Sequence, residues 1–406
     1  MEARHKNLKR HLCNFLKSKE KNYSYFYKQF KGEQIVMKRK IASVILLILS
    51  LNFFTACGGG DNAYDGKTGL LVTTSESSAF TSIQTNVLTA NANELNTTLK
   101  TLATQLTNID ENLTQSDVTT LQEHFVDIMK AWKSVQATYI LGDYNSSLID
   151  TEQLLDFFNT GKNLDVASDI DLALSSSATV ENSLFKNSSK SITALEYLTF
   201  GNQSSTADLV TLMNTNNKRR IETMKVVLST IQGHVNNIVN FYSTDTQFVS
   251  DTTEASNNLV NELVDSAYKL KEQRIGEAAG YVIKYKDNPD ASRFEYYKSQ
   301  KSLEAIKAIL TAHNQIMGEQ DYENFGSFAT DNGASAIVTT IRGNISTSLA
   351  IVEEFSTPIE STVTATEIDE KVQRLFDEVT KLQENYFSSL ISSLNLTAQI
   401  IEADGD

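Results

Sequence analysis

The chain has 406 residues, with 36 Lys and Arg against 50 Asp and Glu side chains, and its formal net charge at pH 7 is −14. A chain this acidic repels phosphate backbones and anionic lipid headgroups, which disfavours nucleic-acid binding and electrostatic docking on a membrane. Its two cysteines and two prolines are too few for a disulfide scaffold or for the turns of a large β-sheet protein.

The N-terminal residues predict export and lipid attachment. Met37 starts a basic stretch, and the apolar run that follows over residues 41–54 is short for a mature transmembrane helix. The run ends in Phe54-Thr55-Ala56-Cys57 and three glycines, which resembles a bacterial lipobox. An ordinary signal peptide or a buried core helix is the alternative interpretation.

These features divide the first 75 residues into three parts. We interpret residues 1–36 as a non-native leader, 37–56 as a lipoprotein signal peptide, and 57–75 as the lipidated Cys57 with a tether. Several acyl chains on one cysteine hold a protein at a membrane almost permanently. Gly58, rather than an acid, follows the cysteine, which favours the outer membrane of a bacterial cell envelope, on its periplasmic or its surface face.

The part of the chain after the signal peptide is more acidic than the whole. Residues 1–56 hold 12 of the Lys and Arg and 3 of the Asp and Glu side chains, so residues 57–406 have a formal charge of −23. Cations and neutral surfaces are better partners for such a body than anions. The charge also has a simpler interpretation, which is solubility.

Residues 76–204 are predicted to form a first helical bundle. Apolar residues at helical spacing predict a helix from about residue 79 to 107 and a second over about 117–141. Shorter elements are expected near 151–159 and 167–174. Another helix is expected over 178–200, and Gly201 would end it in the left-handed conformation.

Residues 205–406 are predicted to form a second helical bundle. Helices are expected at about 206–243, 252–279, 292–317, 333–356 and 364–402. Asp290 and Thr364 are the expected N-cap residues of the third and the last of these. Two consecutive groups of long helices predict an all-α fold of two bundles, of the four-helix-bundle type, packed side by side.

Few sequence motifs indicate chemistry. There is no phosphate-binding glycine loop, no nucleophile elbow, no zinc-protease motif and no basic patch with interleaved aromatic residues. His124 and Asp127 lie three residues apart on one predicted helix, a spacing that lets an imidazole and a carboxylate share a metal ion. Such pairs are also common on solvated helix faces.

Glu196 is the most informative acid, because Leu195, Tyr197 and Leu198 make its helix apolar on most sides. A buried carboxylate must be paired, hydrogen-bonded, metal-bound or protonated. Asp143 is a second acid among aromatic residues. In the alternative, Glu196 reaches solvent or pairs with one of three arginines, Arg219, Arg220 or Arg274.

Four stretches together are similar to the imelysin family of envelope proteins. Residues 191–201, SITALEYLTFG, follow the family's G-x-H-x-x-E motif and the apolar stretch into which it runs. Ala131-Trp132 with Tyr139 and Asp143 resembles the family's tryptophan helix. Residues 273–280 resemble its R-I-G-x-P-x-G segment, and residues 293–306 its helix with a Glu and an S-x-x-S pattern. The resemblance extends in order over most of residues 79–400.

The resemblance implies two four-helix bundles with the motif helix near their interface, and a metal site that includes the motif His and Glu. In this chain Ser191 replaces the motif Gly, Thr193 replaces the His, and Gln136 replaces an Arg expected after the tryptophan. A hydroxyl in place of imidazole removes a strong nitrogen ligand and a base that could activate water near neutral pH. Family-type peptidase activity is therefore not expected.

The residues that remain define the candidate site. Glu196, Thr193 and Asp143 could form an oxygen-only site for a hydrated cation or a polar organic ligand, and His124 could resupply a nitrogen ligand. The resemblance adds pocket candidates from the second half: Arg274, Glu295 and Ser302.

Three functions follow as hypotheses. The first is a lipid-anchored, non-catalytic binding protein of the envelope, with a divalent cation or iron as its ligand and uptake proteins as partners, as the resemblance implies. The second is a metallopeptidase-like enzyme. The third is a structural or interaction lipoprotein whose metal site has been lost.

Overall fold

The computed structural model describes residues 74–109, 112–158 and 165–399. The predicted leader, signal peptide and Cys57 lie outside these ranges. The described residues belong to one compact unit and form helices and turns; between them there is no strand, only an isolated bridge that joins Val363 to Ile368. The predicted all-α fold class is confirmed.

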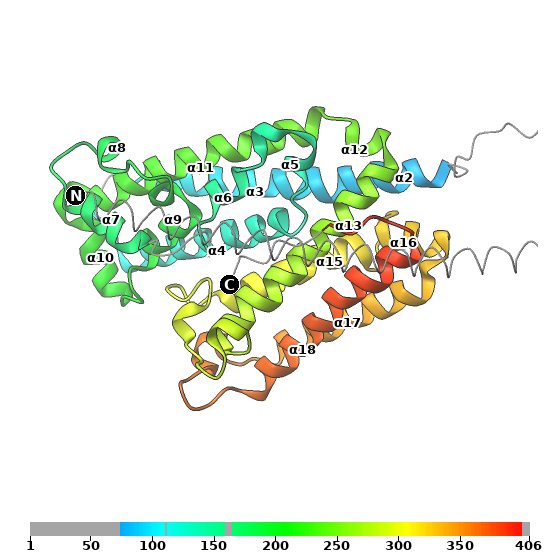
Figure 1. Ribbon diagram of the computed structural model, residues 1–406. Coiled ribbons are helices and arrows are strands. Elements are labelled where there is room, and N and C mark those ends of the chain that lie inside the picture. Colours follow the sequence, from blue (N-terminus) through cyan, green and yellow to red (C-terminus); the bar gives the residue numbers. More distant parts are fainter. Residues whose placement is uncertain (1–73, 110–111, 159–164, 400–406) are drawn as a thin grey trace, which may run out of the picture. The chain divides into compact units, whose positions relative to one another are not determined.

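Four helices pack on one another in the first bundle: α3 (Ala90–Thr107), α4 (Gln115–Gln136), α9 (Ile192–Phe200) and α11 (Arg219–Thr244). α2 (Thr74–Ile83) and the π-helix η1 (Gln84–Thr89) run without a break into α3 (Figure 1). The apolar faces of the bundle helices are buried; Leu99 in α3 and Trp132 in α4, for example, are fully buried. Burial of about 25 cal/mol per Å² of apolar surface is the main stabilising contribution to such a bundle.

The second bundle contains α13 (Thr252–Lys269), α15 (Ser302–Met317), α17 (Ser335–Glu353) and α18 (Glu370–Glu384). α15 also packs against α4, so the two bundles lie side by side, as predicted (Figure 1). α11 follows the predicted domain boundary at residues 204 and 205 and packs on α3 and α9. The boundary itself stays a prediction.

Shorter elements connect these helices. In the first half they are α5 (Leu141–Tyr144), η2 (Ser146–Leu148), α6 (Thr151–Leu155), α7 (Val166–Ser175), α8 (Val180–Ser183), η3 (Ser188–Lys190), α10 (Thr206–Asn214) and η4 (Asn216–Lys218). In the second half they are α12 (Gln247–Ser250), η5 (Leu270–Gly276), α14 (Glu277–Ala279), η6 (Ile283–Tyr285), η7 (Ala291–Arg293), α16 (Phe325–Ala329), η8 (Thr330–Ala334), η9 (Ile359–Thr362), η10 (Asn385–Leu390) and α19 (Ile391–Ser393).

Four of the predicted helices are broken or start at another residue, and the one expected over 292–317 starts only at Ser302. The helix expected over 178–200 is broken into α8, η3 and α9, and the helix expected over 206–243 is interrupted at Asn216–Lys218, where three residues in succession have positive φ. The last predicted helix starts at Glu370, capped by Asp369, because the Thr364 hydroxyl accepts a hydrogen bond from the Glu367 amide in a turn. Asp290 does act as a cap, but of the short 3-10 helix η7.

Gly201 ends α9 with φ 61° and ψ −139°. This is a glycine-favoured conformation but not the left-handed helical one that was predicted. A Cβ at this position would lie 2.5 Å from the Ser204 hydroxyl oxygen, so both backbone and space require glycine here. Within the part of the chain that the structure describes, no helix combines the length and the apolar character needed to cross a membrane.

Candidate functional site

The motif helix α9 is short and almost completely buried. Ser191 caps it: its hydroxyl accepts a hydrogen bond from the Ala194 amide at 3.2 Å and donates one to the Ser188 carbonyl at 2.8 Å. This cap explains why the helix starts at Ile192 and not at 178, since a serine N-cap satisfies a backbone donor of the first turn. The cap fixes the start of the helix, on which Thr193 and Glu196 lie about one turn apart.

Glu196 is 3% exposed and contacts the second half of the chain. Its Oε1 accepts hydrogen bonds from the Ser299 amide at 2.9 Å and from the Ser299 hydroxyl at 2.7 Å. Burial raises the pKa of Glu196 from 4.5 to about 7, against the hydrogen bonds from Ser299 and the charge of Lys298, which lower it. Glu196 therefore does not reach solvent.

None of the three candidate arginines pairs with Glu196. Arg219 donates to the Ala173 carbonyl and the Ser183 hydroxyl, and Arg220 donates to the carbonyls of α9 itself. Arg274 pairs with Glu295. The predicted alternative of an arginine partner is therefore wrong, and a pair of hydrogen bonds from Ser299 satisfies the carboxylate instead.

The raised pKa of Glu196 predicts a stability that falls with pH. The folded state holds the proton more tightly than the unfolded state, so the stabilisation is complete below about pH 4.5 and is lost as pH rises through about 7. Replacing Glu196→Gln should remove about 3 kcal/mol of this dependence. Urea unfolding at several pH values from 5 to 8.5 measures it, with the exposed Asp127→Asn as control. Equal slopes in wild type and Glu196→Gln would contradict the assignment.

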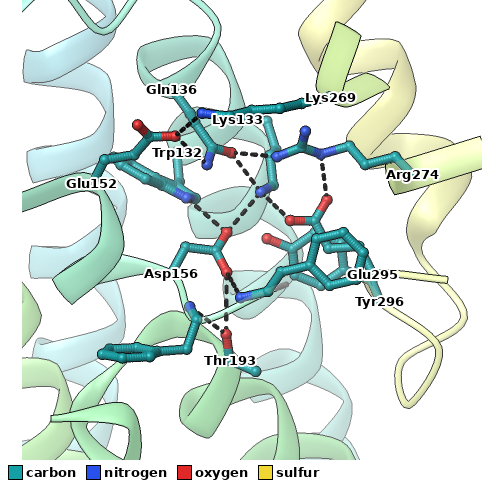
Figure 2. Close-up of polar contacts among 12 residues, drawn as sticks. Trp132, Lys133, Gln136, Glu152, Asp156, Thr193, Lys269, Arg274, Glu295 and Tyr296 are labelled. Carbon is teal, nitrogen blue, oxygen red and sulfur yellow. Dashed lines mark hydrogen bonds and ion pairs between the residues drawn. The ribbon is translucent and has the colours of Figure 1, made fainter. Parts of the chain in front are cut away.

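Thr193 contacts Asp156, not Glu196. Its hydroxyl donates to Asp156 Oδ1 at 3.1 Å and accepts from the Phe157 amide at 3.1 Å. The other oxygen of Asp156 accepts from the Trp132 indole at 3.0 Å (Figure 2). The motif hydroxyl therefore helps to hold a buried aspartate in place.

Lys133 lies in the middle of this network and is fully buried. Its ammonium donates to Asp156 Oδ2 and Gln136 Oε1, both at 2.7 Å, and to Glu295 Oε1 (Figure 2). It also lies over the Tyr296 ring, 5.3 Å from the ring centroid. An ammonium group has three protons, and three side-chain oxygens accept them.

Arg274 completes the network from the second half. It lies in the π-helix η5, and π-turns within helices occur often at functional sites. Its Nε donates to Glu295 Oε2 at 2.8 Å and its Nη2 to Gln136 Oε1 at 3.0 Å. Gln136, which replaces the expected arginine, thus accepts from two cations and donates to Glu152 Oε1 at 2.9 Å.

The network is balanced in charge. We call Lys133, Asp156, Arg274 and Glu295 the ion-pair centre: it has two cations and two carboxylates, each side chain at most 6% exposed. Although burial alone would raise the pKa of Asp156, the charge of Lys133 and the hydrogen bond from it hold that pKa well below its usual range. The centre joins α4 and the Asp156 segment of the first half to η5 and the Glu295 segment of the second.

Comparisons with known proteins agree with this fold and motif. The sequence matches the family model described as Imelysin, which is named as a peptidase family, over residues 88–386. The chain belongs to the imelysin family. Its fold is similar to the crystal structure of an imelysin-like protein from Psychrobacter arcticum 273-4, with a TM-score of 0.64 and 13% identity over 80% of this chain and 97% of that one. None of the curated proteins compared matches the chain.

The structure distributes the predicted imelysin site residues over separate places. It brings Arg274 and Glu295 together and puts Ser302 beside them, where the Ser302 hydroxyl accepts from the Tyr296 amide at 3.0 Å. In the described ranges, no hydrogen bond or ion pair links Asp143 or His124 to Glu196. Asp143 lies near Glu254. Burial raises the pKa of Asp143, and the charge of Glu254 raises it further.

The residues present do not fit the metal that imelysin membership implies. Glu196 is engaged by Ser299, and the ammonium of Lys133 already lies between Asp156 and Glu295, where a cation would bind. Among residues 74–109, 112–158 and 165–399, no three His, Cys, Asp or Glu side chains are grouped so that they could hold one metal ion. A structural metal site in proteins commonly has four such ligands and a catalytic one three.

Sequence reasoning missed Lys133 and Asp156. Lys133 follows Trp132 directly, next to the apolar stripe of α4, and Asp156 lies in Leu154-Leu155-Asp156-Phe157-Phe158. Both patterns place a charge where burial is expected, and buried charges occur in pairs. That pairing was the available signal for the ion-pair centre.

Proposed function

We propose that this imelysin-family chain is a lipid-anchored, non-catalytic binding protein of the bacterial cell envelope. The observation that carries the proposal is the Lys133 ammonium, which is bound by three side-chain oxygens at the centre of the motif region. A cation supplied by the chain itself takes the position that a metal ion would need. The lipobox at Cys57 supports the anchor, and Gly58 supports an outer-membrane location.

The residues of the motif region also lack a group that could activate water. Thr193 has a hydroxyl where the family motif has its imidazole, and a hydroxyl is no base near neutral pH. Asp156 is held ionised by the Lys133 ammonium, which makes it a weak base. Glu196 could accept a proton near pH 7, but its Oε1 is occupied by two donors from Ser299.

A proteolysis assay tests the non-catalytic part of the proposal. The full-length chain is incubated with unfolded casein and added zinc, with and without EDTA. We expect no cleavage that the chelator abolishes. Chelator-sensitive cleavage that disappears in Glu196→Gln would establish the metallopeptidase alternative instead.

Calorimetric titration tests which ligand the motif region accepts. The family resemblance implies iron or divalent-cation uptake, so Fe, Zn and Ca are titrated into the full-length chain and into Glu196→Gln. Because Glu196 and the ion-pair centre already have partners, we expect the two proteins to respond alike. Metal binding that is lost in Glu196→Gln would restore the metal-uptake interpretation at this site.

A further inference from the structure

A second polar region lies where α13 meets the segment that follows α4. Along α13, the residues Glu254, Asn258, Glu262, Asp265 and Lys269 recur every three or four positions and therefore share one helix face. The Tyr139–Glu152 segment and the end of α11 lie opposite: Glu152 contacts Lys269, and Tyr144 lies close to Asn258 and Glu254. We call this region the α13 acidic face.

The α13 acidic face has more negative than positive charge. Lys269 lies 2.8 Å from Asp265 and 3.5 Å from Glu152. Glu262 lies between these groups, and no hydrogen bond or ion pair from another described residue reaches its carboxylate. Burial raises the pKa of Glu262 well above its usual value, and the charges of Asp265, Glu152 and Asp143 raise it further, whereas the charge of Lys269 lowers it.

Two buried phenol hydroxyls on this face lack partners. Tyr242, at the end of α11, is 4% exposed, and neither its hydroxyl nor that of Tyr144 forms a hydrogen bond within the described ranges. The Ile140 backbone lies near the Tyr242 hydroxyl and the Asn258 side chain lies near the Tyr144 hydroxyl, but neither completes a hydrogen bond. Burial raises the pKa of the Tyr242 hydroxyl, and the charge of Glu262 raises it further. An unpaired buried hydroxyl is destabilising by about 1 to 3 kcal/mol.

Together these groups specify a ligand. Oxygens that lack donors favour a positively charged group with several N–H bonds, beside which the Glu262 carboxyl group is ionised. An ammonium has three such bonds. Phe241 and Phe248 pack against the Tyr144 ring, with centroids 6.5 and 6.4 Å away, and offer apolar surface for an alkyl chain. Because no three metal-ligating side chains are grouped within the described part of the chain, a directly coordinated metal ion fits less well.

We propose that the α13 acidic face binds the primary ammonium group of an alkylamine. Glu262 and the Tyr242 hydroxyl accept its hydrogen bonds, and Tyr144 lies beside its alkyl chain. Asp143 and Glu254 are exposed and form the entrance. The inference rests on the binding role proposed above and adds a ligand class to it, at a site separate from the ion-pair centre.

The test is calorimetric titration of the full-length chain with 1,5-diaminopentane. We expect binding that Glu262→Gln weakens at least about tenfold and Tyr242→Phe about threefold, while the exposed Asp127→Asn, which removes the same charge elsewhere, leaves it unchanged. Glu262→Gln should also raise the melting temperature, because it removes a carboxyl group whose ionised form is disfavoured by burial and by the charges of Asp265 and Glu152. Lost binding is then not confused with misfolding. A lysine-containing tripeptide titrated in parallel shows whether the ammonium can come from a protein side chain.

Three results would overturn the inference: no heat of binding with the diamine, an equal loss in Asp127→Asn and Glu262→Gln, or binding of calcium that depends on Glu262. None of them bears on the proteolysis assay. The non-catalytic role therefore stands or falls separately from the amine site.

Discussion

Replacing Lys133→Met is expected to lower the free energy of unfolding by about 3 to 5 kcal/mol. The substitution removes the ammonium between Asp156 and Glu295 and leaves both carboxylates buried. Asp156 then keeps only neutral donors, which are the Trp132 indole, the Thr193 hydroxyl and the Phe158 amide. Arg274 still pairs with Glu295, so Asp156 carries most of the loss. Urea unfolding at pH 7 measures the effect.

A matched control lies one turn earlier on the same helix. Lys130 pairs with Asp127 at 2.9 Å, but both are about half exposed, so Lys130→Met should change the free energy of unfolding by less than about 1 kcal/mol. In the double variant Lys133→Met, Asp156→Asn, part of the lost stability should return because the stranded charge is gone. Similar effects of Lys133→Met and Lys130→Met would show that Lys133 is not in a paired, buried position.

Acidification is expected to destabilise the protein by about 4 kcal/mol through His313 alone. His313 is fully buried in α15, with Nδ1 3.1 Å from the Tyr386 hydroxyl and Nε2 3.0 Å from the Ser266 hydroxyl. Burial lowers the pKa of His313 from 6.5 to about 3. Between about pH 6.5 and 3 the unfolded chain therefore binds a proton at His313 that the folded chain does not bind. Stability is lost as pH falls through this range.

The effect is read from the slope of stability against pH. His313→Gln keeps a polar side chain in the cavity but cannot take up a proton, so its slope between pH 6.5 and 3 should be smaller than that of the wild type. His124→Gln, on the half-buried face of α4, is the matched control for the substitution itself. If His313→Gln and the wild type lose stability in parallel, His313 is not the buried neutral base described here.

Much of the fold follows from apolar periodicity. The predicted helices near 79–107, 252–279 and 333–356 match α2 to α3, α13 to α14, and α17 within a few residues, because each has an apolar face at helical spacing. The structure departs from the sequence pattern where side chains from distant segments compete for backbone groups. Residues 292–301 are the clearest example.

The helix predicted to start at residue 292 starts at Ser302 instead. Within the preceding segment, the Tyr296 amide donates to the Ser302 hydroxyl, the Ser299 amide donates to Glu196, and Gln300 has φ 57°. These contacts replace the hydrogen bonds of a helix with one to a nearby side chain and one to Glu196, which lies 103 residues away in the sequence. Periodicity within one segment has no information about such partners.

The candidate site was predictable in part for the same reason. Glu196 could be recognised as buried from its own neighbours. Thr193 could be recognised as a site residue from its place in the family motif. That Thr193 would bind Asp156, and Glu196 would bind Ser299, depends on how the two bundles pack. Asp143 shows the limit most clearly: it was grouped with Glu196 by composition, and the structure places it at the α13 acidic face, near Glu254.

A crystal structure of the full-length chain grown with zinc, with anomalous diffraction measured at the zinc edge, tests the central claim most directly. The account predicts the Lys133 ammonium within hydrogen-bonding distance of Asp156 and Glu295, and no anomalous peak between these carboxylates. A zinc peak on Asp156, Glu295 or Glu196, with the Lys133 side chain turned away, would contradict it.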